Sequence, residues 1–239
     1  MRSFRNTNPV INSVKTDSVV TDYQVTYAGV AIRTLFLIGL AIFSAFMTIY
    51  YLAPMGMDVF AGVMITAFIV GFISVIVGTR SVRLAPIFAI LYALSEGAIL
   101  GFVSAVYAWV YNGIVPTAIM TTVIVLLVMM LLYSTEIIKV TSRFASIMLV
   151  ALISVIVMSI IPLLIPGIEY SGLFFLICIV SAILSALFLL LDFESIKTCV
   201  EAGTDAKYGW VLSLGLMVTL VWLYIEILRL LAILARNRE

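Results

Sequence analysis

Residues 171–200 read SGLFFLICIVSAILSALFLLLDFESIKTCV, and the first charged side chain in this stretch is Asp192. The 21 uncharged residues before it would extend about 31 Å as an α-helix, which is roughly the thickness of the hydrocarbon core of a bilayer. A second apolar run occupies 209–234 and is interrupted by Glu226 and Arg229 alone. These two runs predict a pair of consecutive transmembrane helices at the end of the chain.

Earlier parts of the chain repeat this pattern, so that seven apolar runs are long enough to cross a membrane as helices. The expected spans cover 32–53, 59–78, 84–110, 114–133, 144–165, 171–200 and 209–234. The predicted fold class is therefore all-α, a polytopic integral membrane protein with a bundle of seven transmembrane helices. We divide the chain into an N-terminal tail at 1–31, a membrane domain at 32–235 and a short C-terminal tail at 236–239.

The composition of the 239 residues agrees with this fold class and excludes several functions. Hydrophobic residues make up 64% of the chain and charged residues 10%, with a mean hydropathy of +1.28, far from the range of soluble domains. A net charge of +1 without a basic cluster argues against nucleic acid as a partner. The chain contains no His, and Cys178 and Cys199 lack metal-ligand spacing, so we expect no resident metal or cofactor. No protease or other catalytic motif is present, and we expect no enzyme activity.

The distribution of basic residues predicts the orientation in the membrane, because loops rich in Lys and Arg stay in the cytoplasm. The N-terminal tail is basic, and so is the chain around every second junction between spans. These basic residues are Arg2, Arg5, Lys15, Arg33, Arg80, Arg83, Lys139, Arg143, Lys197 and Lys207. We therefore expect a cytoplasmic N-terminus in a bacterial plasma (inner) membrane, with an endoplasmic reticulum membrane as the alternative. Seven crossings then place Arg236 and Arg238 on the opposite side.

Three carboxylates lie in or beside the apolar runs, namely Glu96, Asp192 and Glu226. An ionisable group at membrane depth costs several kcal/mol, about 2.5–3.5 by the lower scales, and usually marks a functional site. Gly97 and Gly101 form a small-xxx-small pair that lets another helix approach Glu96 closely. The alternative for Glu96 is a structural hydrogen bond between helices.

Glu226 admits two interpretations. Arg229 follows three residues later, so the two side chains can form a local ion pair that lowers the cost of both charges. Alternatively, Glu226 faces Asp192 across antiparallel helices and the two carboxylates share a proton. This second geometry requires a turn near Gly209, with the last helix beginning near Leu214, so that both acids lie about 16 Å from the turn.

Three segments carry a resemblance to a known family. They are LLLDFESI at 189–196, AKYGW at 206–210 and GLMVTLVWLYIEILRLL at 215–231. Together with the Glu96–Gly97 helix, they resemble the Bax inhibitor-1 family, also called the transmembrane Bax inhibitor motif family. The resemblance implies a seven-helix bundle that forms a pH-sensitive calcium leak, with Asp192 and Glu226 as the proton-sensing pair. Family members that carry Asp at the second position match this chain less closely.

A latch that neutralises the anionic pair is also implied by the resemblance. Its arginine corresponds by approximate spacing to Arg80, with Arg83 as the other candidate. The residues themselves leave a plainer alternative, in which both arginines only mark the cytoplasmic side.

Ca²⁺ prefers carboxylate and carbonyl oxygens, so the three intramembrane acids could form an ion pathway for it. We expect Ca²⁺ as the permeant ion, passing near Asp192 and Glu226, and expect protons and the lipid bilayer as further partners. One competing function is a non-conducting regulator that binds other membrane proteins, such as a protease or a stress or apoptosis modulator. Another is a proton-coupled transporter, which inverted repeats would favour, and the sequence contains no evident repeat.

Overall fold

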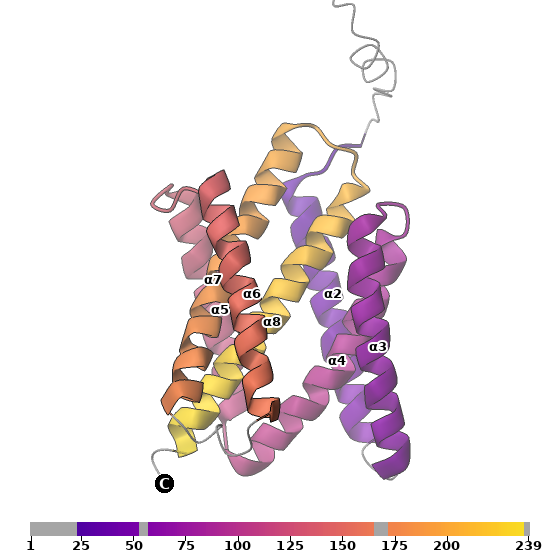
Figure 1. Ribbon diagram of the computed structural model, residues 1–239. Helices are drawn as coiled ribbons and strands as arrows, with labels where there is room; N and C mark the ends of the chain where they lie inside the picture. Colours follow the sequence, from indigo (N-terminus) through magenta and orange to yellow (C-terminus); the bar gives the residue numbers. More distant parts are fainter. Residues whose placement is uncertain (1–22, 53–56, 165–171, 237–239) are drawn as a thin grey trace, which may run out of the picture.

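A computed structural model describes residues 23–52, 57–164 and 172–236 (Figure 1). The described chain contains seven helices that are long and apolar enough to cross a membrane, which confirms the predicted fold class of an integral membrane protein. They are α2 (Tyr27–Met47), which continues into the π-helical turn η1 (Thr48–Leu52), α3 (Met57–Arg80), α4 (Ala85–Val110), α5 (Ile114–Ser134), α6 (Ser142–Leu164), α7 (Gly172–Glu201) and α8 (Tyr208–Arg236).

The first helix begins at Tyr27, five residues before the start that hydropathy suggests. The cause is local, because the Thr26 hydroxyl accepts a hydrogen bond from the Gly29 amide at 3.0 Å and so caps the helix. Hydropathy cannot detect this cap, since Thr26 and Tyr27 are not strongly apolar. Four of the basic residues on which the predicted orientation depends lie outside the described residues, namely Arg2, Arg5, Lys15 and Arg238.

Successive helices run in opposite directions through the bundle (Figure 1). The start of α2 and the loops at 81–84, 135–141 and 202–207 therefore share one end, while the end of α8 lies at the other. The alternation that the basic residues predicted is thus present in the fold. The assignment of the first end to the cytoplasm stays a prediction.

α4 packs against α2 at the two glycines that the sequence singled out. A Cβ atom on Gly101 would lie 2.7 Å from the Ala45 Cα, and one on Gly97 would overlap the backbone of Ala41. The Ser44 hydroxyl donates to the Leu94 carbonyl at 2.6 Å across the same contact. Small residues therefore allow the two backbones to approach, as expected for helix association in a membrane.

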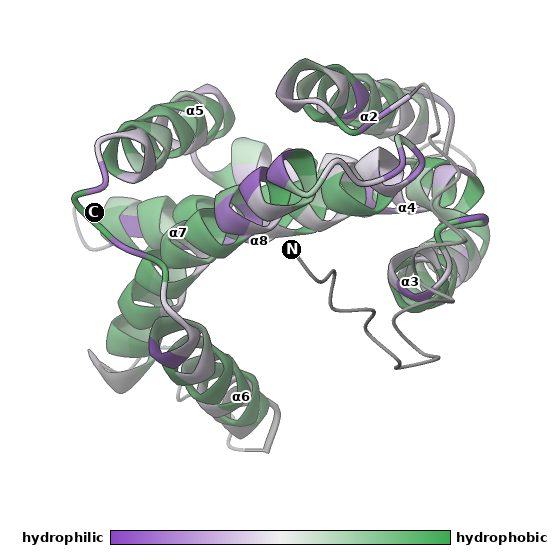
Figure 2. Ribbon diagram, turned by 90° about the horizontal axis from the view of Figure 1, so that it is seen from above, coloured by the Kyte–Doolittle hydropathy of each residue, from purple (hydrophilic) through white to green (hydrophobic). Residues whose placement is uncertain are grey.

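α8 is the central helix of the bundle. Seen from above, it passes between α2 and α5 on one side and α3 and α6 on the other (Figure 2). It packs against α2, α3, α4, α5 and α7. Its residues Leu214, Leu223 and Leu228 are fully buried, so both ends and the middle of the helix contribute to the core.

A short segment before α2, at 23–26, lies across the turn between α7 and α8, and we call it the N-terminal strap. The Val25 amide donates to the Thr204 carbonyl at 2.9 Å, and the Ala206 amide donates to the Tyr23 carbonyl at 3.0 Å. The Val25 side chain is 2% exposed. The strap thus fixes the α7–α8 turn to the beginning of α2.

Candidate functional site

Polar side chains of α7 gather on one face of the helix. Cys178, Ser181, Ser185 and Asp192 fall within an arc of about 60° at 3.6 residues per turn. Cys178, Ser181 and Ser185 are at most 2% exposed. Buried hydroxyl and carboxyl groups at membrane depth are costly unless they meet polar partners, so this face is a candidate functional surface.

α8 presents a matching face, because Gly215, Thr219, Glu226 and Arg229 fall within an arc of about 80°. The Asp192 Oδ1 atom lies 3.8 Å from the place where a Gly215 Cβ would be. The Thr219 hydroxyl interacts with the Asp192 carboxyl group, and Arg229 interacts with the Cys178 thiol. The two faces therefore meet along the helices.

We call this contact the polar seam and define it by eight residues. They are Cys178, Ser181, Ser185 and Asp192 of α7, and Gly215, Thr219, Glu226 and Arg229 of α8.

Asp192 forms the part of the seam nearer the turn between α7 and α8. Its Oδ2 atom is enclosed and has no hydrogen-bond partner among the described residues, and the same is true of the Ser181 hydroxyl. The described residues also provide no ion pair for Asp192. An enclosed carboxylate oxygen without a partner is a place where a proton, a water molecule or a cation would be stabilised.

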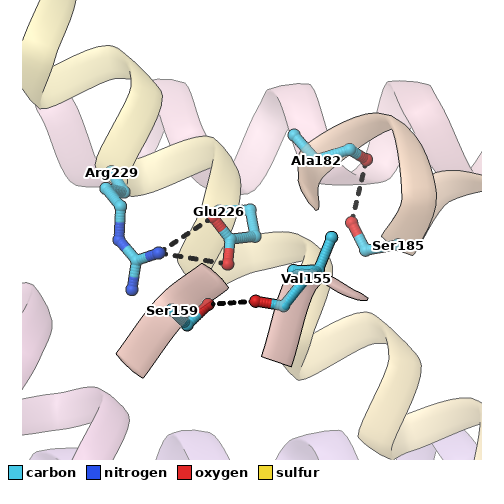
Figure 3. Close-up of polar contacts among 6 residues, drawn as sticks. All are labelled: Val155, Ser159, Ala182, Ser185, Glu226 and Arg229. Atoms are coloured by element: carbon cyan, nitrogen blue, oxygen red, sulfur yellow. Dashed lines mark hydrogen bonds and ion pairs between the residues drawn. The ribbon is translucent and has the colours of Figure 1, made fainter. Parts of the chain in front are cut away.

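Glu226 and Arg229 form an ion pair further down the seam (Figure 3). Arg229 Nη1 lies 3.2 Å from both carboxylate oxygens of Glu226. Glu226 is 5% exposed, so it is buried in the bundle. Arg229 also borders a cavity of about 270 Å³ near the C-terminal end of α8, together with Tyr107 and Tyr111 of α4. Arg229 thus contacts both this cavity and the Glu226 carboxylate.

The structure does not bring Asp192 and Glu226 together as a direct pair. The sequence-based register was wrong, because α8 begins at Tyr208 and not near Leu214. Asp192 lies nine residues before the end of α7 and Glu226 lies 18 residues after the start of α8, so their depths differ by about 13 Å at 1.5 Å per residue. Asp192 instead faces Gly215 and Thr219.

The short turn between the helices explains this register. Gly203 adopts a left-handed φ of 63° at the end of α7, which favours glycine. The Asp205 carboxylate then accepts a hydrogen bond from the Lys207 amide at 2.8 Å, one residue before α8 begins. These local contacts start α8 at Tyr208, close to the start of the predicted span at 209 and six residues before the start that the paired-acid geometry requires.

Glu96 belongs to a different contact. Its Oε2 atom lies 3.6 Å from the place of a Gly71 Cβ, so the side chain lies between α4 and α3. It is half-buried there, one helical turn after the buried Tyr92. Glu96 is therefore not a member of the polar seam.

Arg80 and Arg83 lie at the junction of α3 and α4, and both are exposed. The part of the chain that the structure describes contains no ion pair of either arginine. Their role as a latch stays a prediction.

Three hydroxyl-bearing residues of the seam were not predicted as site residues from the sequence, namely Ser181, Ser185 and Thr219. A signal for them exists, because Ser181, Ser185 and Asp192 are spaced by four and seven residues, and so are Gly215, Thr219 and Glu226. Such spacing places small or polar residues on one helix face. Within the described residues, no group of three His, Cys, Asp or Glu side chains could hold a metal ion.

Comparison with known families gives a match over nearly the whole chain. The model of the family described as Bax inhibitor 1 like matches residues 8–236, which includes all the described helices and every residue of the seam. A search of curated proteins gives no match. On the strength of the family match, the chain belongs to the Bax inhibitor 1 like family.

Proposed function

We propose that this protein is a pH-dependent calcium leak whose ion path follows the polar seam. The observation that carries the proposal is the alignment of Asp192 and Glu226 with buried hydroxyl groups along one helix contact. Oxygen ligands of this kind suit Ca²⁺. Two acids at separate depths would bind the cation in turn, and weak sites of this kind let an ion leave as well as enter.

Asp192 is the carboxylate that is more available to bind the cation. Glu226 is already compensated by Arg229 at 3.2 Å, whereas the described residues offer Asp192 only the Thr219 hydroxyl. Protonation of Asp192 removes its negative charge and with it the attraction for Ca²⁺. We therefore expect flux to fall as the pH is lowered.

The test is Ca²⁺ entry into liposomes that contain the purified full chain and a calcium-sensitive dye, measured between pH 6 and pH 8. We expect Asp192→Asn to lower the flux at pH 8 about tenfold, which corresponds to about 1.4 kcal/mol, and to flatten its dependence on pH. Glu194→Gln is the matched control, because Glu194 lies on the same helix and bonds Tyr133 at 2.7 Å, outside the seam.

Other outcomes would identify a different function. Folded protein that gives no flux above that of empty liposomes at any pH would reject the leak and favour a non-conducting regulator of other membrane proteins. Stoichiometric proton movement against a Ca²⁺ gradient would indicate a coupled transporter. Equal flux in Asp192→Asn and the wild type would remove Asp192 from the ion path.

A further inference from the structure

The face of α8 that points away from the polar seam borders a groove. A cavity of about 400 Å³ is lined on its inner side by Met217, Leu220, Val221 and Tyr224 of α8. These residues lie about 180° around the helix from Gly215, Thr219 and Glu226. α8 therefore has the polar seam on one side and this groove on the other.

The groove opens sideways, between α2 and α5. Its rim contains Ile42 and Phe46 of α2, which are 54% and 67% exposed, and Ile119 and Val123 of α5, which are 50% and 49% exposed. Figure 2 shows α2 and α5 on the same side of α8, separated from each other. Exposed apolar residues on these helices form the surface that contacts lipid, so the groove is continuous with the bilayer-facing surface.

Among the described residues that line the groove, no side-chain hydroxyl is left without a hydrogen-bond partner. Its hydroxyls already have partners, because Ser104 and Tyr224 bond each other at 2.8 Å and Thr122 donates to the Ala118 carbonyl at 2.8 Å. Water is unfavourable in such an apolar space because it needs two to four polar partners. The occupant must therefore be apolar.

The groove opens onto the surface that faces lipid, so the apolar groups next to its mouth are the acyl chains of the bilayer. A methylene group occupies close to the roughly 30 Å³ of a water molecule, so the groove would hold an acyl-chain segment of about 13 methylene groups. We propose that an acyl chain of a bilayer lipid occupies this groove and packs against the back of α8.

Photolabelling of the full chain in proteoliposomes tests the proposal. The probe is a phosphatidylcholine with a diazirine in the middle of one acyl chain, and labelled residues are identified by mass spectrometry. We expect labels on Leu220 and Tyr224 of the inner wall, which are 9% exposed and half-buried, respectively, and so are poorly accessible to lipids that merely surround the protein. Ile153 of α6, 54% exposed and away from the groove, reports the labelling by surrounding lipid.

Two variants give a matched comparison. Val123→Trp places a large ring at the rim and should lower labelling of Leu220 and Tyr224 about tenfold, while Ile153 stays labelled. Val150→Trp makes the same change on α6, where Val150 is 64% exposed, and should leave the labelling of the groove unchanged. Thermal unfolding of both variants checks that each is folded.

The proposal would be overturned by labelling of Ile153 without labelling of the groove, or by unchanged groove labelling in folded Val123→Trp. Cross-links between two copies of the chain at the groove would overturn it as well, in favour of a second copy as the occupant. The readout is independent of Ca²⁺ flux, so the failure of the proposed leak would leave this result intact.

Discussion

At the scale of single residues, the ion pair of Glu226 and Arg229 explains how two charges persist inside an apolar helix. Glu226 is 5% exposed, and Arg229 Nη1 reaches both of its oxygens at 3.2 Å. A buried ion pair is weak evidence for stability, because desolvation offsets much of the attraction. The removal of one partner is different, since it leaves the other charge buried and uncompensated.

Arg229→Met should therefore destabilise the protein by about 2–3 kcal/mol. The double variant Arg229→Met, Glu226→Met removes both charges and should recover most of this loss, because neither charge is then left alone. Thermal unfolding in detergent measures both effects. A double variant that is no more stable than Arg229→Met would show that the arginine acts through packing and not through the carboxylate.

At the same scale, the sequence predicted which acids lie in the membrane but not what each one faces. Glu96, Asp192 and Glu226 stand out because charges are rare in long apolar runs. Their partners depend on the register of the helices, and a start of α8 at Tyr208 instead of near Leu214 changes the depth of Glu226 by about 9 Å. The conformation of Gly203 and the contact of Asp205 with Lys207 set that register, and neither leaves a signal in hydropathy.

At the scale of helices, the lengths were predictable because the thickness of the bilayer sets them. The Gly97–Gly101 contact was predictable as well, since the small-xxx-small pattern is a direct consequence of close backbone approach. The sequence did not say which helix approaches, and the structure assigns α2.

Gly97→Ala should destabilise the α2–α4 contact by about 1–3 kcal/mol, because the added methyl group overlaps the Ala41 backbone and the helices must separate. Gly39→Ala is the matched control, since Gly39 lies in α2 and a Cβ there would meet nothing within 4 Å. We expect it to be neutral or stabilising by about 0.5–1 kcal/mol. Thermal unfolding compares the pair, and equal midpoints in the two variants would contradict the close contact.

The N-terminal strap gives a second prediction about the helices. Val25→Ala removes two buried methyl groups from the strap and should loosen its hydrogen bonds to the α7–α8 turn. Hydrogen exchange of the Ala206 amide should accelerate about tenfold, which corresponds to about 1.4 kcal/mol of local stability. Amides of α6 serve as the control because the strap does not contact that helix in the described fold. Unchanged exchange at Ala206 would mean that the turn is held without the strap.

At the scale of the whole molecule, α8 links the two proposals. Its seam face carries Glu226 and faces Asp192 of α7, and its opposite face borders the groove for the proposed acyl chain. The helix contacts most of the bundle, so a change in its position would alter both surfaces together. Hydropathy alone predicted a bundle of seven helices but not the central place of α8, because every span is apolar and central burial depends on which faces meet.

The two ends of the bundle differ in charge, and this difference predicts the orientation in the membrane. Of the described basic residues, seven lie at the end that contains the start of α2, and only Arg229 and Arg236 lie towards the other end. The positive-inside rule places the first end in the cytoplasm.

A membrane-impermeant maleimide applied to intact bacterial cells should therefore react with Asn112→Cys, in the α4–α5 loop. It should react with Ser81→Cys, in the α3–α4 loop, only after the cells are permeabilised. Both variants carry Cys199→Ser, so that the buried Cys178 is the remaining native thiol. Reaction of Ser81→Cys alone in intact cells would invert the orientation, and equal reaction of both would contradict the alternating helices, because the two loops lie at opposite ends.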